Sequence, residues 1–101
     1  MARQKTIPPI HPGETIREDI LKPLGLSVNR LAMELHVPAT RMSEIVNGRR
    51  SITADTALRL ARYLGTTAQF WLNLQSKYDL ERAEDEYASR IEQEVRPRRA
   101  A

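Results

Sequence analysis

The chain of 101 residues has no cysteine, which excludes disulfide bonds, thiol nucleophiles and zinc sites built from cysteine. It also lacks an apolar run long enough to span a membrane, and its first residues lack the apolar core of a secretion signal. These absences are typical of a protein that works in a reducing compartment without a membrane. We therefore expect a cytoplasmic location.

Glycine and histidine are scarce. The four glycines lie singly at predicted helix boundaries, so no glycine-rich loop is available to bind a phosphate. The two histidines, His11 and His36, have no companion ligands at a spacing that suits a metal. Each serine fits a helix cap, an exposed position or a loop, and no histidine stands where it would activate one. We expect no enzymatic activity, no metal, no cofactor and no small-molecule substrate.

Acidic residues are unevenly distributed. Residues 1–78 contain 11 lysines and arginines against 6 acids, whereas residues 79–94 contain 2 against 7. Three arginines near the C-terminus bring the net charge to +3. A basic body followed by an acidic segment suits a protein whose body faces nucleic-acid phosphates and whose far end faces another partner.

Strand-like alternation is absent, and apolar residues recur instead at helical spacing, so we predict an all-α protein. An arm is expected over residues 1–12 and a five-helix domain over residues 13–78. A charged helix and a basic tail follow over residues 79–101. The first helix is predicted to end at Pro23, with Leu24 and Leu26 in the core.

Residues 27–50 (SVNRLAMELHVPATRMSEIVNGRR) organise this domain. Ser27 is placed to cap a first short helix, Pro38 interrupts the chain, and Gly48 ends a second helix. One face of each helix is apolar: Leu31, Ala32, Leu35, Val37, Met42, Ile45 and Val46. Two such helices joined by a short turn form a helix-turn-helix motif, here over residues 27–47, whose second helix can enter a DNA major groove. The alternative is an ordinary packed helix pair without a DNA function, and the spacing alone does not decide between them.

The opposite side of this motif carries candidate DNA contacts. Thr40 is positioned to meet base edges, because the N-terminal residues of such a second helix reach the groove. Arg41 fits either a guanine or a phosphate. The remaining candidates include helix-terminal and loop residues suited to the DNA backbone. The full set is Ser27, Asn29, Ala39, Thr40, Arg41, Ser43, Glu44, Asn47, Arg49 and Arg50.

Glu44 is the unusual member of this set, because a carboxylate on a DNA-facing surface is repelled by phosphates. Two interpretations remain open. It either accepts a hydrogen bond from cytosine N4, or it pairs with an arginine such as Arg41, three residues earlier on the helix.

A broad apolar surface is predicted on the helix that begins near Thr67. Phe70 and Trp71 start it, and it continues at helical spacing into the acidic segment. One part must close the core, and the rest is expected to form a subunit interface through Trp71, Leu74, Tyr78, Leu80 and Tyr87. The alternative, that all of it is core, agrees equally well with the periodicity.

Several phrases resemble those of one known family. They are HPGE (residues 11–14), SEIVNGRRSIT (residues 43–53), FWLNLQ (residues 70–75) and YDL (residues 78–80). Across roughly residues 7–82 the chain resembles the HigA (VapI-like) family, which are Xre/Cro-type helix-turn-helix antitoxins. The acidic helix and the arginine tail lie outside the closely similar part.

The resemblance implies a lambda-repressor-like fold of five helices with a C-terminal extension helix. It also implies a cytoplasmic homodimer, without a cofactor, that binds a palindromic operator before its own operon. Such proteins neutralise a small RelE-like toxin that cleaves mRNA, and the matching positions suggest Ala39, Thr40, Ser43 and Asn47 as groove or phosphate contacts. The alternatives are an orphan Xre-type regulator and a protein-binding adaptor without a cognate toxin. The arm over residues 1–12 and the acidic helix over residues 79–94 are the candidate surfaces for the toxin, and the acidic helix is also a candidate for the dimer.

Overall fold

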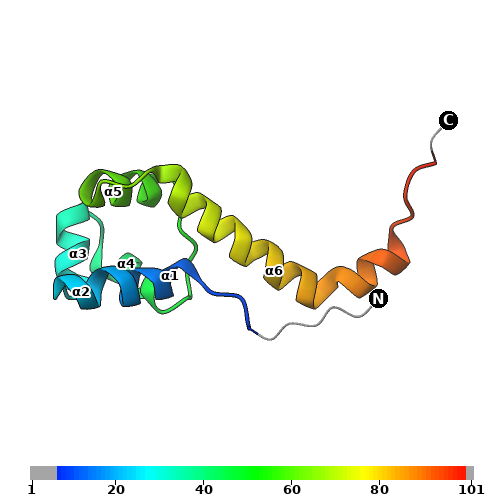
Figure 1. Ribbon diagram of the computed structural model, residues 1–101, viewed down its shortest axis with the longest axis horizontal. Helices are drawn as coiled ribbons and strands as arrows, with labels where there is room; N and C mark the ends of the chain where they lie inside the picture. The colour runs from blue at the N-terminus through cyan, green and yellow to red at the C-terminus, as the bar shows by residue number, and fades with distance from the viewer. Residues whose placement is uncertain (1–6, 100–101) are drawn as a thin grey trace.

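The computed structural model describes residues 7–99, and within that range it contains five helices and no strand (Figure 1). The predicted all-α fold is confirmed. Residues 1–6 of the predicted arm lie outside the described range. The first helix consists of three consecutive segments, α1 (Pro12–Thr15), the π-helical η1 (Ile16–Leu21) and α2 (Lys22–Leu24); the others are α3 (Val28–Leu35), α4 (Ala39–Val46), α5 (Ala54–Leu64) and α6 (Ala68–Glu94).

The first helix does not end at Pro23 as predicted. The amide of Lys22 bonds to the carbonyl of Arg17, five residues earlier, so the turn before the proline is wider than an α-helical turn. A proline lacks a donor and crowds the preceding turn of an ordinary α-helix, and the wider turn relieves this crowding. The helix therefore continues to Leu24 and ends at Gly25, whose φ is 64°. The prediction for Leu24 was also wrong, because its side chain is 58% exposed.

Hydroxyl side chains cap three of the later helices. Ser27, Thr53 and Thr67 precede α3, α5 and α6, and each accepts a hydrogen bond from the amide three residues later, at 3.0, 3.5 and 3.1 Å. Each bond satisfies one of the amides that a helix N-terminus leaves unpaired. These caps determine where the helices around the motif begin.

The core lies between the motif and the helices that pack on it. All seven apolar motif residues predicted to face inward are buried. Trp71 is also buried, with 1% exposure, and its indole N–H donates to Thr66 Oγ1 at 2.8 Å. The prediction that Trp71 forms a subunit interface was wrong, because one helical stripe of α6 closes the core and Trp71 lies on it. Leu74 lies at the edge of this core and is half-buried.

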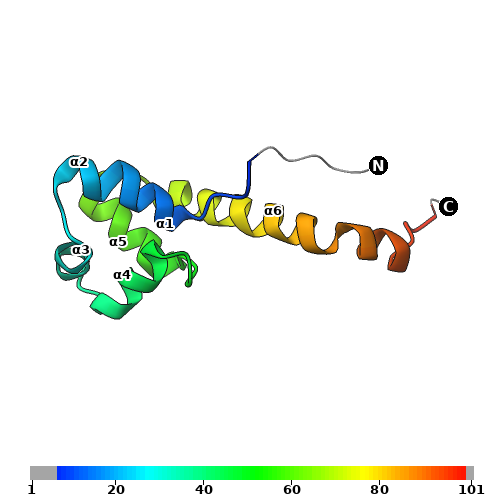
Figure 2. The ribbon, with the colours of Figure 1, turned by 90° about the horizontal axis from the view of Figure 1, so that it is seen from below.

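Helix α6 packs against α5 with its first half, and its second half extends beyond the rest of the body (Figures 1 and 2). The extended half carries the exposed side chains of Leu80, Tyr87 and Ile91, and the exposed Val95 follows the end of the helix. At 100° per residue Leu80, Tyr87 and Ile91 fall on one stripe, on the opposite side of the helix from the buried Trp71. The core of this chain therefore leaves them uncovered. Among residues 7–99, no helix meets the length and apolarity that a membrane span requires.

Candidate nucleic-acid interface

Helix α4 is held against the body by one face and leaves the other uncovered. Met42 and Ile45 are fully buried, and α3 packs directly on α4. The opposite side presents the predicted groove contacts Ala39, Thr40, Ser43 and Asn47, all exposed, with Glu44 half-buried among them. Figure 2 shows α3 and α4 at the end of the molecule away from the extended half of α6. The uncovered face of α4 is thus accessible to a large ligand such as a DNA duplex.

The chain turns back on itself immediately after α4. The amide of Gly48 donates to the Ile45 carbonyl at 3.0 Å, and the amide of Arg49 donates to the Glu44 carbonyl at 2.8 Å. This is a Schellman cap, and the φ of 75° at Gly48 supplies the left-handed residue that it requires. Asn47 adds a bond from its side-chain amide to the Ser43 carbonyl at 2.8 Å. The cap places Arg49 and Arg50 beside the end of α4.

Glu44 pairs with an arginine, but the arginine is Arg50 rather than Arg41. The Nε and Nη2 atoms of Arg50 both lie 2.8 Å from Oε1 of Glu44. The Schellman turn brings Arg50 back over the last turn of the helix, a contact that spacing along a straight helix does not reveal. The pair compensates the negative charge of Glu44 where a DNA phosphate would otherwise repel it.

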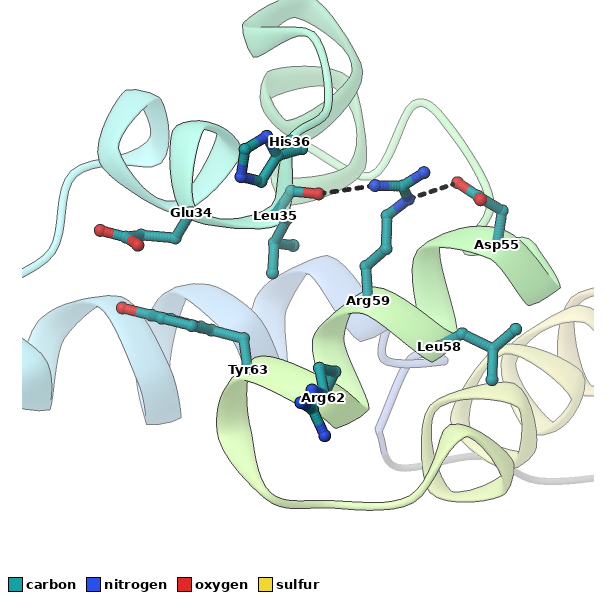
Figure 3. A pocket seen from close by; sticks show the side chains of 8 residues that line it. All are labelled: Glu34, Leu35, His36, Asp55, Leu58, Arg59, Arg62 and Tyr63. Carbon is teal, nitrogen blue, oxygen red and sulfur yellow. Dashed lines mark hydrogen bonds and ion pairs between the residues drawn. The ribbon is translucent and has the colours of Figure 1, made fainter.

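Arg41 is held by a carboxylate on the next helix. Its Nη1 donates to Oδ2 of Asp55 at 2.9 Å, and the same oxygen accepts from Nε of Arg59 at 3.0 Å. Arg59 also donates from Nη1 to the Leu35 carbonyl at 3.0 Å (Figure 3). The hydrogen bond from Arg59, and then that from Arg41, hold the pKa of the Asp55 carboxyl below its usual value. This cluster of Arg41, Asp55, Arg59 and the Leu35 carbonyl joins α4 and α5 to the end of α3.

Sequence reasoning missed the role of Asp55 because it considered Arg41 only with partners on its own helix. Asp55 stands in the first turn of α5, a position that is favourable for an acid on helix-dipole grounds alone. An acid at this position with a basic residue four positions later, here Arg59, was the available sequence signal for an ion pair on α5. With only 29% of its side chain exposed, Arg41 lies at the edge of the α4 face rather than at its centre.

The N-terminus of α3 carries the other two predicted contacts. Ser27 uses its hydroxyl to cap the helix, and Asn29, in the first turn, is exposed. Arg30 beside them pairs with Glu34 at 2.8 Å, along the same helix. A helix N-terminus offers backbone amides that can bind a phosphate, although the Arg30 amide here already donates to Ser27.

A close backbone contact supports α4 from behind. A Cβ atom placed on Gly13 would lie 1.9 Å from the carbonyl oxygen of Ile45, so α1 and α4 touch where only glycine fits. Arg17 adds a bond from Nη1 to the Val46 carbonyl at 3.4 Å. The sequence prediction placed Gly13 at a helix boundary and did not anticipate this contact, which has no signature in periodicity.

His11 and Gln75 connect the loop after α4 to the remaining helices. His11 Nδ1 accepts from the Gly13 amide at 2.9 Å, and its ring meets Tyr78 edge-on with 4.8 Å between centroids. Burial lowers the pKa of His11, while the Arg50 backbone and the charge of Asp79 act in the opposite direction. Gln75 is buried, accepts from the Ile52 amide at 2.8 Å and donates to Asp79 at 2.9 Å.

A groove of about 630 Å³ lies between the end of α3 and α5 (Figure 3). Glu34 and Asp55 balance Arg59 and Arg62 in its lining, with apolar contributions from Leu35, Leu58 and Tyr63. Part of this charge is already used by the cluster that holds Arg41. The groove therefore has no net charge to attract an ion, and it lies beside the α4 face rather than within it.

Comparisons with known proteins agree with this geometry. The family model for the helix-turn-helix matches residues 18–71. Virulence-associated protein I of Dichelobacter nodosus is 56% identical over 88 residues, which cover 87% of this chain and 82% of the relative. The solved structure of an addiction module antidote protein of the HigA family from Coxiella burnetii has a TM-score of 0.86 and 50% identity, and covers 91% of this chain and 100% of its own.

The chain belongs to the HigA (VapI-like) family of helix-turn-helix proteins. Another similar structure is the Pseudomonas aeruginosa antitoxin HigA with the higBA promoter, at a TM-score of 0.86, 46% identity, and coverage of 88% of this chain and 97% of that one. An uncharacterised helix-turn-helix-type transcriptional regulator, YbaQ of Escherichia coli, is 42% identical over 78 residues, or 77% of this chain and 69% of its own. For this HigA-family protein, the family interpretation of the sequence is confirmed.

Proposed function

We propose that this protein is an antitoxin that binds the operator of its own operon and represses it. The observation that carries this proposal is the uncovered face of α4, polar along its length and followed directly by Arg49 and Arg50. The Pseudomonas aeruginosa antitoxin HigA, a structural relative of similar length, has been solved with its promoter. Insertion of α4 into the major groove is the docking that this geometry supports best.

The residues then divide by position. Thr40 and Ser43, with Ala39 and Asn47 at either end of the α4 face, meet the groove. Ser27 and Asn29 at the start of α3, and Arg49 and Arg50 after α4, meet phosphates. Arg41 holds α4 against α5 through Asp55, so we assign it a positioning role in place of base recognition.

We further propose that the protein acts as a homodimer through the extended half of α6. The exposed stripe of Leu80, Tyr87 and Ile91 needs a cover that the described residues do not supply, and a second copy has the same stripe. Tyr78, also predicted for the interface, is half-buried against His11 and lies on the same side of α6 as Trp71, away from this stripe, so we leave it out of the proposed interface. Pairing would present two α4 faces to one duplex, and half-sites about 34 Å apart would match them.

The partner to be neutralised is a small RelE-like toxin that cleaves mRNA. The family supports this assignment, and the charge of residues 79–94, with 7 acids against 2 arginines, suits an RNA-binding protein with a basic surface. Co-expression tests it: this protein should relieve the growth arrest caused by the product of an adjoining toxin gene. Continued arrest, with both proteins present in soluble form, would remove the toxin from the proposal.

DNA binding is tested by fluorescence anisotropy with the region upstream of the gene as probe and a scrambled duplex of equal length as control. Specific binding should survive at physiological salt, where non-specific affinity is weak. Equal affinity for the two duplexes would refute operator recognition.

A second candidate is an orphan regulator without a toxin. The similarity to YbaQ, which is named as a transcriptional regulator, favours it. Gene neighbourhood separates the two, because an adjoining short reading frame for a basic protein supports the antitoxin and an isolated gene supports the orphan regulator.

A further inference from the structure

Glu44 lies within the face of α4 that we propose enters the DNA groove. Thr40 is one turn before it and Asn47 is nearly one turn after it, so the three side chains follow one line along the helix. The Glu44 side chain is 44% exposed and is therefore accessible to a ligand on that face. Any duplex that contacts Thr40 and Asn47 also meets Glu44.

The contact with Arg50 uses only one side of this carboxylate. Both guanidinium nitrogens of Arg50 lie 2.8 Å from Oε1. Among the described residues no donor is assigned to Oε2, which leaves that oxygen to accept from outside the chain. Arg50 thus reduces the electrostatic penalty of an acid near phosphates and holds the carboxylate by Oε1, so that Oε2 is not used by this pair.

Only two groups in the major groove can donate to such an oxygen, cytosine N4 and adenine N6. Guanine presents the acceptors N7 and O6, and thymine presents O4 and a methyl group, so both reject a carboxylate. Adenine places the acceptor N7 beside its amino group, which repels an acid, whereas cytosine has no acceptor on its groove edge. An ionised carboxylate is therefore matched to cytosine.

We infer that Glu44 is a specificity-determining residue that selects a cytosine in each half-site through its N4 amino group, with Arg50 as the positioning residue. This inference rests on the proposed operator binding and adds the base that one side chain recognises. It differs from a structural role, in which the pair with Arg50 would only fasten the loop to α4.

The test measures operator affinity of the full-length protein by competition anisotropy, with every base pair of one half-site changed in turn to the other three. For the unmodified protein, one cytosine should be required, and its replacement by guanine or thymine should weaken binding about tenfold. Replacing that cytosine by 2-pyrimidinone, which lacks only the amino group, should produce the same loss. Glu44→Ala should bind the original and altered duplexes equally, and Glu44→Gln should shift the preference toward adenine.

Two further variants separate this role from charge and folding. Glu34→Gln removes an acid that also pairs with an arginine, Arg30 at 2.8 Å, and should keep the cytosine requirement. Arg50→Ala should weaken the cytosine requirement while circular dichroism shows an intact helical fold. If Glu44→Ala loses affinity for all duplexes alike, or keeps the same base profile, the inference is wrong although operator binding stands. If the unmodified protein shows no sequence preference at all, both the inference and the proposed function are wrong.

Discussion

Replacing Gly13 by alanine tests the contact that supports α4 from behind. In a helix without tertiary constraints, this change stabilises by about 1 kcal/mol because alanine has the higher helix propensity. Here the new Cβ would lie 1.9 Å from the Ile45 carbonyl oxygen and under 3.0 Å from two further backbone atoms. Carbon and oxygen pack at about 3.3 Å or more, so α1 and α4 must separate by roughly 1.4 Å. No side chain can rotate away, because all three atoms belong to the backbone.

The expected cost follows from what that separation disrupts. Overpacking of a core costs about 1–3 kcal/mol, and a gap of this size also forfeits much of the dispersion energy along the contact. We expect Gly13→Ala to lower the free energy of unfolding by about 2–4 kcal/mol after the propensity gain, which would lower the melting temperature by roughly 10–20 °C in a domain of this size. The Ile45 carbonyl also accepts the Gly48 amide, so the loop that carries Arg49 shifts with it. Operator affinity should therefore fall even at temperatures where the variant is folded.

Urea denaturation followed by circular dichroism measures the effect, with two matched variants. Glu14→Ala changes the adjacent exposed residue and should alter stability by less than about 0.5 kcal/mol. Gly25→Ala places its Cβ in open space but at a φ of 64°, so it reports backbone strain alone, about 1 kcal/mol. A Gly13→Ala protein as stable as the original, or more stable, would show that α1 and α4 are not in backbone contact.

Three further predictions concern pH, DNA and assembly. Because burial holds the pKa of His11 below 6.5, the unfolded chain takes up this proton first. The free energy of unfolding should then fall as the pH drops through about 6.5, and His11→Asn, which keeps a capping acceptor, should reduce this slope in urea titrations at several pH values. Arg49→Ala should weaken binding to all duplexes alike and reduce the slope of log affinity against log salt by about one, whereas an effect on one base position would contradict phosphate contact. Tyr87→Asp should convert the dimer to a monomer in sedimentation equilibrium without changing the helical content, and a dimer that persists would place the interface elsewhere.

The caps and the buried face of the motif were predictable because both follow from local rules. A hydroxyl before an apolar run satisfies the first amides of a helix, and a glycine after it permits the left-handed turn, whatever the rest of the chain does. The buried set of residues 31–46 likewise follows from a period of 3.6 residues. His36 is an exception: it ends α3 at a φ of 57°, a position that the rules assign to glycine or asparagine.

Which face of α6 packs on the core was not predictable in the same way. Its aromatic residues satisfy two overlapping helical stripes, and periodicity does not say which stripe meets the core. The choice depends on the Trp71 indole, which reaches Thr66, and on Gln75, which bonds to the loop before α5. The Gln75 bond joins α6 to a distant loop and the Trp71 bond joins it to the turn before it, so the periodicity of α6 contains neither contact. For this reason the sequence grouped Trp71 with Leu80 and Tyr87 on one surface. In the structure Leu80 and Tyr87 are exposed, whereas Trp71 is buried in the core.

The ion pairs around α4 were also not predictable from one helix alone. They matter most, because they determine which charged side chains of α4 are free to contact DNA. Arg41 and Glu44 are three residues apart and could pair along the helix, which would neutralise both. The fold separates them instead, since Asp55 binds Arg41 from α5 and the Schellman turn brings Arg50 to Glu44. As a result Arg41 is tied to the body, while Glu44 keeps one oxygen that Arg50 does not contact. Asp55→Asn would remove the carboxylate that holds Arg41 and allow Arg41 to pair with Glu44. This variant should therefore weaken the cytosine requirement of Glu44, although Asp55 itself is not a proposed DNA contact.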